Sequence, residues 1–395
     1  MTRDIQESMK MLDIELQAIS SGYDRKTCWV HARAGAIPRP GQPPIVVLTM
    51  HKLRITGDDV FYPICDMRTD DGGKTWVGPT EHRDAFARRK VRKGLEEGIC
   101  DFWPAWHAAS GRLLGIGHTV RYFDDNIPRA PEPRRTAYSI YDPDRREWSR
   151  WKTMESPYPE EGAGSVQRYD LPDGQILLPT YFIIPEMFRA RIEDRYRAQY
   201  GVTVMRCTFD GEILRYVEHG NEMTVPTGRG LCEPSLAFFR GRYYLTLRND
   251  DFGAVATGSD GLHYDEPRRW MFDDGSDLGN YNTQQHWVTM PDALYLVYTR
   301  RGANNDNVVR HRAPLFIAQV DTDRLCVIRE TEQILVPNRG ARLGNFGVTR
   351  ISETESWVTV AEWMQTHPPR YWDVSQCEKY GSDNTVWVAR VRCRR

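Results

Sequence analysis

Six short apolar runs recur along the chain at intervals of about 50 to 70 residues. They cover residues 45–50, 112–117, 175–180, 243–248, 294–299 and 357–362. Runs of this length that are rich in β-branched and aromatic residues are typical of strands buried in a sheet. In β-rich sequence, a repeat of this period indicates the blades of a propeller. The repeat therefore predicts an all-β chain that forms a single β-propeller domain over residues 1–395, built of four-stranded antiparallel blades.

The count of strands gives six blades. The last blade lacks a fourth strand, which the alternating residues at about 11–20 are able to supply by closing the ring. Closure of this kind removes an exposed sheet edge. Two charge-rich stretches, residues 83–97 and 187–199, resemble helices, and we expect them to be solvated connections on the surface.

Composition excludes several classes of protein. The chain has 53 Lys and Arg residues against 54 Asp and Glu residues, so it has no basic excess for binding a nucleic-acid backbone. No apolar run reaches the roughly 18 residues of a membrane-spanning helix. The N-terminal residues lack the apolar core of a signal peptide, which predicts a cytoplasmic protein, or a secreted or periplasmic one if a leader has been removed. The eight cysteines show no metal-binding or redox spacing and are expected to be buried, reduced thiols.

One turn carries a specific structural signature. Residues 69–76 read Thr-Asp-Asp-Gly-Gly-Lys-Thr-Trp, and residues 257–264 form a degenerate copy. The carboxylate of Asp71 is placed to accept backbone N–H groups, glycine permits positive φ, and Trp76 is able to pack between blades. This segment resembles the Asp-box of sialidase-type propellers. Such turns lie on the outer rim, so the resemblance implies the fold and not the reaction.

Polar residues interrupt the strand that comes before each apolar run. These segments are residues 29–33, 101–104, 165–169, 232–235, 284–287 and 345–348. In a propeller the innermost strands surround the axis, and buried polar groups are costly unless they are paired. The pattern predicts a ligand site at the axis, although each residue taken singly could equally be a satisfied structural group.

Part of this pattern is similar to that of true sialidases. Arg33 precedes an Ala-Gly-Ala-Ile-Pro segment, Glu233 is followed by Arg248 on the next strand, and Arg312 is the candidate for a third arginine. The resemblance implies that the three arginines contact a substrate carboxylate and that Glu233, which corresponds to the catalytic glutamate, also contacts the substrate. Where sialidases have a nucleophilic tyrosine, this chain has Phe346. Phenylalanine has no hydroxyl group with which to attack an anomeric carbon, so a retaining sialidase is disfavoured.

A second resemblance covers most of the chain. The segments around His31, His51, Tyr122 and His286 look like propeller-type polysaccharide lyases, most closely the L-rhamnose-α-1,4-D-glucuronate lyases and more distantly the ulvan lyases. Those lyases use two histidines 20 positions apart, as His31 and His51 are. The resemblance implies that His31 and His51 are the catalytic base and acid in an undetermined order, with Tyr122 as an alternative acid. It also implies that Arg121 and Arg168 hold a uronate carboxylate and that His286 contacts the substrate.

The reaction explains why these residue types are needed. A 4-O-linked uronate has a weakly acidic hydrogen on C5, and an arginine that neutralises the carboxylate lets charge develop there. Histidine can take or give a proton near neutral pH. We therefore expect β-elimination at a bond to a uronate, acting on an oligosaccharide or polysaccharide that carries rhamnose-capped glucuronate.

Alternatives remain open at this point. A sialidase-like hydrolase would use Asp58 or Asp59 with Glu233, a non-catalytic propeller would only bind the glycan, and His31 and His51 could be packed strand residues. No cofactor is required. A structural calcium ion at the axis near Gln285 and His286 is an alternative, with oxygen ligands from Asn282, Glu233 and Asp101. Seven blades, as described for the resembling lyases, also remain open, as does the oligomeric state.

Overall fold

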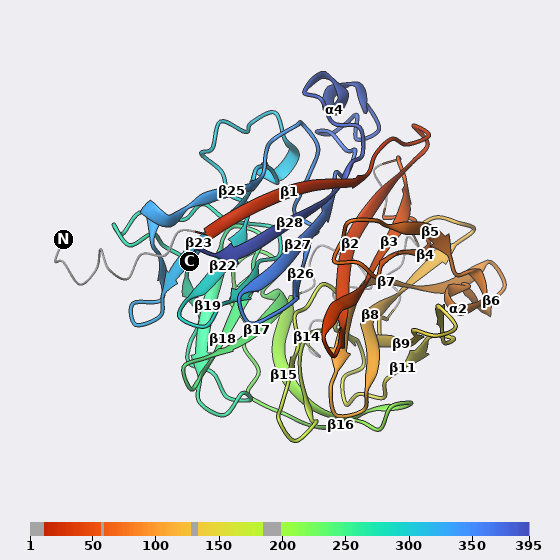
Figure 1. Cartoon of the computed structure of the whole chain (residues 1–395), viewed down its shortest axis with the longest axis horizontal. Helices are drawn as coiled ribbons and strands as arrows, with labels where there is room; N and C mark the ends of the chain where they lie inside the picture. Colours follow the sequence, from red (N-terminus) through yellow and green to blue (C-terminus); the bar gives the residue numbers. More distant parts are fainter. Residues whose placement is uncertain (1–11, 57–58, 128–132, 185–198, 395) are drawn as a thin grey trace.

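Six antiparallel sheets form the blades of a β-propeller in the computed structural model, which describes residues 12–56, 59–127, 133–184 and 199–394 (Figure 1). The fold class is confirmed, and the count is six. In each blade the predicted apolar run forms the second strand, next to the innermost one. The innermost strands contain or adjoin the polar segments singled out in the sequence.

The first three blades have the following strands. Blade 1 contains β2 (Thr27–Arg39), β3 (Gln42–Arg54), β4 (Phe61–Thr69) and β5 (Val77–Glu81). Blade 2 contains β7 (Leu95–His107), β8 (Arg112–Phe123), β9 (Thr136–Asp142) and β10 (Glu147–Trp148), with β6 (Arg89–Arg92) beside β7 and β11 (Lys152–Thr153) beside β9. Blade 3 contains β12 (Glu161–Gly162), β13 (Tyr169–Asp170), β14 (Ile176–Ile183), β15 (Tyr200–Phe209) and β16 (Leu214–His219).

The other three blades follow the same plan. Blade 4 contains β17 (Cys232–Phe239), β18 (Arg242–Arg248), β19 (Gly253–Gly258) and β20 (Arg268–Arg269). Blade 5 contains β21 (His286–Thr289), β22 (Leu294–Tyr298), β23 (Leu315–Asp321), β24 (Cys326–Val327) and β25 (Gln333–Val336). Blade 6 contains β26 (Gly347–Arg350), β27 (Glu355–Ala361), β28 (Val386–Cys393) and β1 (Leu12–Ser20).

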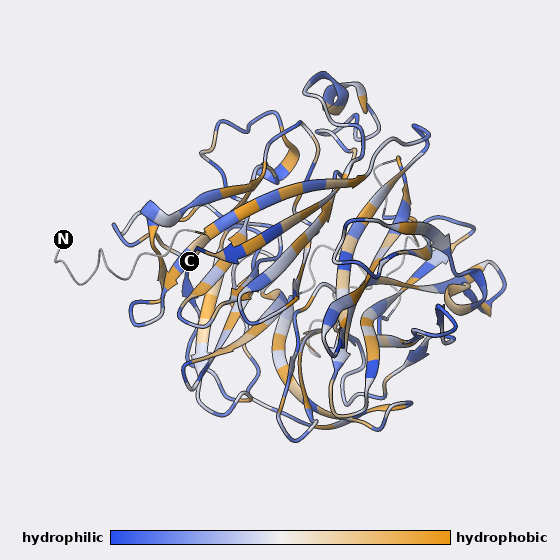
Figure 2. Cartoon of the chain, viewed as in Figure 1, coloured by the Kyte–Doolittle hydropathy of each residue, from blue (hydrophilic) through white to orange (hydrophobic). Residues whose placement is uncertain are grey.

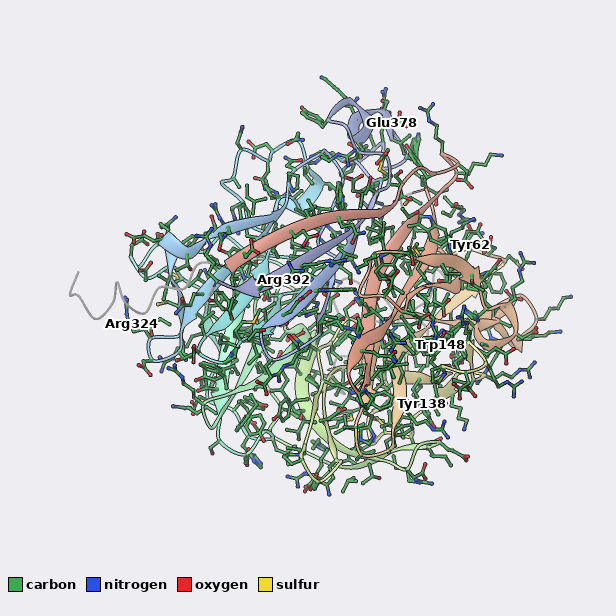
Figure 3. All side chains as sticks on the ribbon, viewed as in Figure 1. Tyr62, Tyr138, Trp148, Arg324, Glu378 and Arg392 are labelled. Atoms are coloured by element: carbon green, nitrogen blue, oxygen red, sulfur yellow. The ribbon has the colours of Figure 1, made fainter. Side chains whose placement is uncertain are left out.

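The N-terminal strand closes the ring, as predicted. β1 pairs antiparallel with β28 from Leu12 opposite Cys393 onward, and Figure 1 shows the two strands side by side. Arg392 of β28, labelled in Figure 3, contacts Glu15 of β1 and Glu355 of β27, each at 3.0 Å. The two ends of the chain therefore share one blade, and β28 does not present a free edge.

The Asp-box turn has the geometry that its sequence predicts. Asp71 accepts bonds from the Thr75 N–H at 3.0 Å and the Thr75 hydroxyl at 2.7 Å, which lowers the pKa of its carboxyl group well below the usual value. Gly72 and Gly73 have φ of 72° and 80°. The Trp76 ring lies 6.2 Å from that of Trp357 in blade 6, so the turn packs against the neighbouring blade.

Apolar side chains fill the spaces between blades, and Figure 2 shows hydrophobic positions distributed along the strands of every sheet. Seven cysteines are buried, Cys393 is partly buried, and all eight are free thiols, as expected. No helix within the described ranges is long and apolar enough to cross a membrane.

One prediction of local structure is wrong. Residues 83–97 form only a four-residue helix, α2 (Arg83–Phe86), and continue as β6 and the start of β7, because the fully exposed β6 pairs as an edge strand with β7. The helix-like stretch at 187–199 lies almost entirely outside the described residues. A second short helix, α4 (Ser375–Lys379), stands outside the ring (Figure 1).

Candidate active site

A repeated distortion of the backbone shapes the axial site. His31, Asp101, Ser165, Glu233 and Asn282, each from a different blade, have φ between 46° and 58°. In three blades a register shift accompanies this residue, at Val30/Arg33, Cys100/Trp103 and Cys232/Ser235. A β-bulge re-aims a side chain that would otherwise alternate with the pleat. Left-handed backbone is unfavourable for these residue types and clusters at functional sites in proteins.

Asp101 is the centre of one group of these side chains. Its carboxylate accepts a 2.5 Å bond from the Ser165 hydroxyl and lies 3.4 Å from Arg33, 3.5 Å from His31 and 3.3 Å from His118. Burial alone would raise the pKa of Asp101, but its basic neighbours outweigh burial and hold that pKa well below the usual value. Asp101 is therefore a fixed negative charge shared by three blades.

His31 and His51 are brought together, as the lyase resemblance implies. Val30 pairs with His51 across β2 and β3, and the two imidazole rings are 5.9 Å apart. Both are buried, and Phe61 lies against both, at 4.9 and 5.6 Å. The His51 Nδ1–H donates to the Tyr62 carbonyl at 2.9 Å, which leaves the lone pair on Nε2, and Nε2 has no partner within the described structure. Burial lowers the pKa of His51 to about 4, so the ring is neutral at pH 7.

Tyr122 lies behind the site rather than in it. Its hydroxyl accepts a bond from the Phe61 N–H at 3.0 Å and donates to the Asp59 carbonyl at 3.4 Å. Arg88 stacks on the Tyr122 ring at 4.0 Å and donates to the Phe61 carbonyl at 2.9 Å. Burial raises the pKa of Tyr122 well above its usual value, so it is a poor proton donor. Its observed contacts instead hold the segment that carries Asp59.

Asp59 lies in a cationic setting. Burial raises the pKa of Asp59, and the nearby guanidinium groups of Arg342, Arg310 and Arg312 only partly offset this effect. A carboxyl group of this kind retains a proton more readily than an ordinary aspartate. Asp58, the alternative to it in the sequence, lies outside the described residues.

Glu233, Arg248 and Arg312 form a second linked group. Arg248 donates to Glu233 at 2.5 Å and to the Asn282 side chain at 2.6 Å, and Arg312 donates to the Asn345 side chain at 3.0 Å. Arg312 also donates to the Asn282 carbonyl. Both arginines are buried, and the Nε atom of each lacks a hydrogen-bond partner within the described structure.

Arg33, His286 and Phe346 are part of the packing at the axis. Arg33 is 0% exposed and donates to the Phe346 carbonyl at 3.2 Å and to Ser165 at 2.7 Å. The His286 ring lies between those of Trp103 and Phe346, at 4.7 and 4.8 Å, and its Nδ1 contacts the Ser235 hydroxyl. Arg33 and His286 therefore contact neighbouring blades at the axis, and their role in substrate binding stays a prediction.

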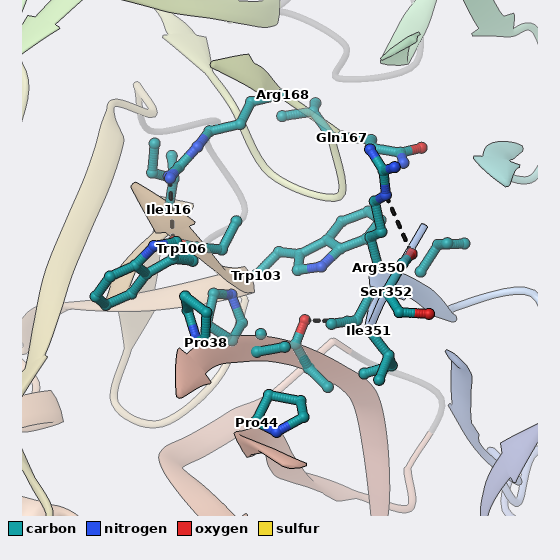
Figure 4. A pocket seen from close by; sticks show the side chains of 18 of the residues that line it. Pro38, Pro44, Trp103, Trp106, Ile116, Gln167, Arg168, Arg350, Ile351 and Ser352 are labelled. Carbon is teal, nitrogen blue, oxygen red and sulfur yellow. Dashed lines mark hydrogen bonds between the residues drawn. The ribbon is translucent and has the colours of Figure 1, made fainter. Parts of the chain in front are cut away.

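Arg121 and Arg168, the two arginines taken from the lyase resemblance, do not join either group of axial side chains. Arg121 forms a 2.9 Å ion pair with Glu97 on β7, and its side chain projects from the face of β8 opposite to Tyr122. Arg168 pairs with Asp170 and donates to the carbonyls of Leu114 and Ala105. Arg168 instead lines a cavity of about 530 Å³ at the other end of the innermost strands, seen in Figure 4 with Pro38, Trp106 and Arg350.

The residues proposed for calcium have other partners. The Gln285 side chain accepts from Thr246 and donates to the Thr283 carbonyl, which leaves it poorly suited to bind an ion. Cys100, Asp101 and His118 form the one described cluster with metal-ligand chemistry. The Cys100 sulfur lies 3.6 and 3.9 Å from the two ring nitrogens of His118, beside the ring rather than in front of one lone pair. Asp101 Oδ2 lies 3.3 Å from His118 Nε2 and 3.9 Å from the Cys100 sulfur, so the three side chains contact one another directly.

Sequence reasoning missed two arginines of the site, Arg310 and Arg342. Arg342 is buried, donates to Gln365 and stacks on Trp363 at 4.1 Å. The Trp363 ring in turn lies 5.8 Å from His31. Both arginines come from irregular segments between strands, so no strand pattern pointed to them. The one signal in the sequence was their position, since Arg310 comes just before Arg312 and Arg342 comes just before Asn345.

Comparison with solved structures identifies the fold. The chain superposes on a protein of unknown function from Dyadobacter fermentans with a TM-score of 0.58 and 12% identity, covering 96% of this chain and 99% of that one. The Trypanosoma rangeli sialidase superposes with a TM-score of 0.59 and 10% identity, covering 96% of this chain and 58% of that one. The NanB sialidase of Streptococcus pneumoniae superposes with a TM-score of 0.61 and 11% identity, covering 95% of this chain and 70% of that one. No protein-family model and no curated protein matches the sequence. By its structure, the chain has a six-bladed β-propeller fold that is similar to the fold of these solved structures.

Proposed function

We propose that this protein is a carbohydrate-active lyase that cleaves the bond at O4 of a uronate by β-elimination, with rhamnose-capped glucuronate as the expected substrate. One observation carries the proposal: His31 and His51 form a buried pair in which His51 Nε2 is unpaired, and Arg248 and Arg312 are buried with unpaired Nε atoms. The fold supports a carbohydrate ligand, because a Trypanosoma rangeli sialidase of similar fold was solved in complex with 2,3-difluorosialic acid.

The residues are suited to distinct steps. Arg248 and Arg312 hold the uronate carboxylate and stabilise the charge that develops when C5 is deprotonated. His51 Nε2 takes the C5 hydrogen, the electron pair forms the C4–C5 double bond, and the C4–O4 bond breaks. Asp59, with its raised pKa, gives its proton to the departing O4. Since Phe61 covers His51, the substrate reaches the base only when the Phe61 ring turns aside.

A glycoside hydrolase is the second candidate, because the pKa of Asp59 is raised by burial, as a general acid requires. Glu233 would then be the second carboxylate, but its 2.5 Å ion pair with Arg248 lowers its nucleophilicity. Phe346 is fully buried and offers no hydroxyl group, so a tyrosine-based retaining mechanism has no nucleophile at that position.

A panel of acidic oligosaccharides tests the proposal. It contains rhamnose-capped and uncapped glucuronate oligosaccharides together with a sialyl glycoside. Elimination creates a conjugated double bond that absorbs in the ultraviolet, hydrolysis releases a reducing sugar without that absorbance, and simple binding yields neither product. Ultraviolet absorbance with a uronate substrate, lost in both Asp59→Asn and His51→Gln, supports the lyase. Release of reducing sugar that depends on Asp59 but not on His51 would establish the hydrolase instead.

A further inference from the structure

The arginines of the site exceed the carboxylates available to them. Asp101 and Ser165 pair with Arg33, and Glu233 pairs with one terminal nitrogen of Arg248, whose Nε has no partner in the described structure. Arg310, Arg312 and Arg342 form no ion pair with any described carboxylate. The acidic group with the largest electrostatic effect is Asp59 for Arg310 and Arg342 and Glu233 for Arg312. Arg310 and Arg342 therefore face one carboxylate, Asp59, whose pKa is raised.

Arg342 is set apart from the pair that would hold the first carboxylate. Arg248 and Arg312 are joined through Asn282, whereas Arg342 is fixed by Gln365 and by the Trp363 ring. The Nε atom of Arg342 is buried and without a partner in the described structure. Arg310, at the end of a loop with φ of 58°, is exposed and forms no hydrogen bond with any described residue. The Leu343 N–H donates to the Arg312 carbonyl, so the segments that carry Arg310 and Arg342 lie side by side, and both arginines have unused donors next to the Arg248–Arg312 pair.

The pKa shifts of Arg342 and Arg312 agree with a division of these arginines into two groups. Burial lowers the pKa of Arg342 to about 9, and repulsion from Arg310 and Arg248 adds to the shift. The pKa of Arg312 is lowered well below its usual value for the same reasons, with Arg342 as the strongest cationic neighbour. A buried cation that lacks compensation is costly, and an anion placed between such groups removes that cost.

We propose that Arg342 and Arg310 form a second anion subsite, so that the ligand carries a further acidic group beside the carboxylate held by Arg248 and Arg312. The proposal deepens the proposed function and rests on it for the identity of the first group. The chemistry of the second group is that of a sulfate, a phosphate or another carboxylate, which guanidinium donors bind alike.

Sulfate is the probe for this subsite, titrated by calorimetry into the full chain saturated with D-glucuronate. Chloride at matched ionic strength is the reference. We expect the wild type to bind sulfate alongside glucuronate, and Arg342→Gln to bind it at least tenfold more weakly while its affinity for glucuronate is kept. The matched control is Arg350→Gln, an exposed arginine at the opposite end of the axis, which should behave as the wild type. Phosphate and malonate titrations then distinguish the three acidic groups.

Competition between sulfate and glucuronate, rather than joint binding, would overturn the proposal, because it would show a single subsite. Unchanged sulfate affinity in Arg342→Gln would overturn it as well. If Arg342→Gln does not fold, Arg310→Gln gives the same test from an exposed position. If sulfate competes with glucuronate while elimination activity is present, the proposed function holds and the second subsite does not. If sulfate and glucuronate bind jointly while the protein shows no elimination activity, the second subsite holds and the proposed function does not.

Discussion

Individual residues of the axial site are held in conformations that the backbone resists. Left-handed backbone at a residue such as His31, Asp101 or Glu233 costs on the order of 1–3 kcal/mol. Three different blades carry this cost at equivalent places, and the side chains concerned meet at Asp101 or at Arg248. Strain repeated in this way indicates that the positions of these side chains matter more than local stability.

His51→Gln separates a catalytic from a packing role. A glutamine amide can still donate to the Tyr62 carbonyl, so we expect the fold to be kept while kcat for elimination falls by about 10²–10⁴. The control is His107→Gln, since His107 is an equally buried strand histidine that contacts Ser110 and the Gly174 carbonyl. That variant should lose about 1–3 kcal/mol of stability with kcat unchanged. Ultraviolet product formation and Tm are measured on both, and full turnover in His51→Gln would remove His51 from the mechanism.

The low pKa of His51 predicts how stability depends on pH. The ring binds a proton at about pH 6.5 in the unfolded chain and at about pH 4 in the folded one, so its contribution is complete above pH 6.5. It is lost as the pH falls toward 4, by about 1.4 kcal/mol per pH unit. His51→Gln should therefore lose less stability than the wild type between pH 7 and 4.5 in urea unfolding. Parallel losses in the two proteins would show that His51 is not buried as a neutral ring.

At the scale of elements, the second strands and the Asp-box could be predicted because local chemistry determines both. Apolar runs such as 243–248 fit only a buried strand, and Asp71, Gly72 and Thr75 specify their turn without help from the rest of the molecule. The prediction of a helix at 83–97 was wrong because pairing with β7 overrides the helical preference of a charged segment. The bulges could not be predicted, since a positive φ at His31 or Glu233 leaves no mark in the residue type.

Removing β1 tests the closure of the ring. Deletion of residues 1–20 leaves β28 paired with β27 on one side only, so we expect a lower Tm and aggregation through the exposed edge of β28. Deletion of residues 1–11 leaves β1 whole and serves as the control. Size-exclusion chromatography and thermal unfolding compare the two proteins. Equal stability and solubility in both would mean that β1 does not contribute to closure.

The Asp-box should matter for stability and not for catalysis. Asp71→Ala removes the acceptor for the Thr75 N–H and hydroxyl groups on the rim, far along β4 from Phe61. We expect a lower Tm with kcat and KM unchanged. Asp70→Ala, in the adjacent position, removes a surface ion pair with Arg68 and controls for charge. A fall in kcat for Asp71→Ala at full folding would contradict a purely structural role.

Over the whole molecule, the axis has two ends that differ in chemistry. One end collects the histidines, Asp59 and the unpaired arginines, whereas the other is a cavity lined by proline and tryptophan side chains with Arg168 at its wall (Figure 4). Both ends present arginines from the innermost segments, so the sequence could not tell which arginine belongs to which end. The direction of each strand and the bulges that re-aim its side chains decide this.

Matched substitutions at the two ends test that division. Arg248→Lys keeps a charge but loses the planar fork that contacts Glu233 and Asn282, so both KM and kcat for the uronate substrate should worsen. Arg168→Lys loses bonds to the carbonyls of Leu114 and Ala105, which should lower Tm because these bonds connect blades 2 and 3. Its kcat/KM should stay that of the wild type. If Arg168→Lys instead impaired turnover while Arg248→Lys did not, the active site would lie at the cavity end of the axis, and neither His51 nor Asp59 would take part in proton transfer.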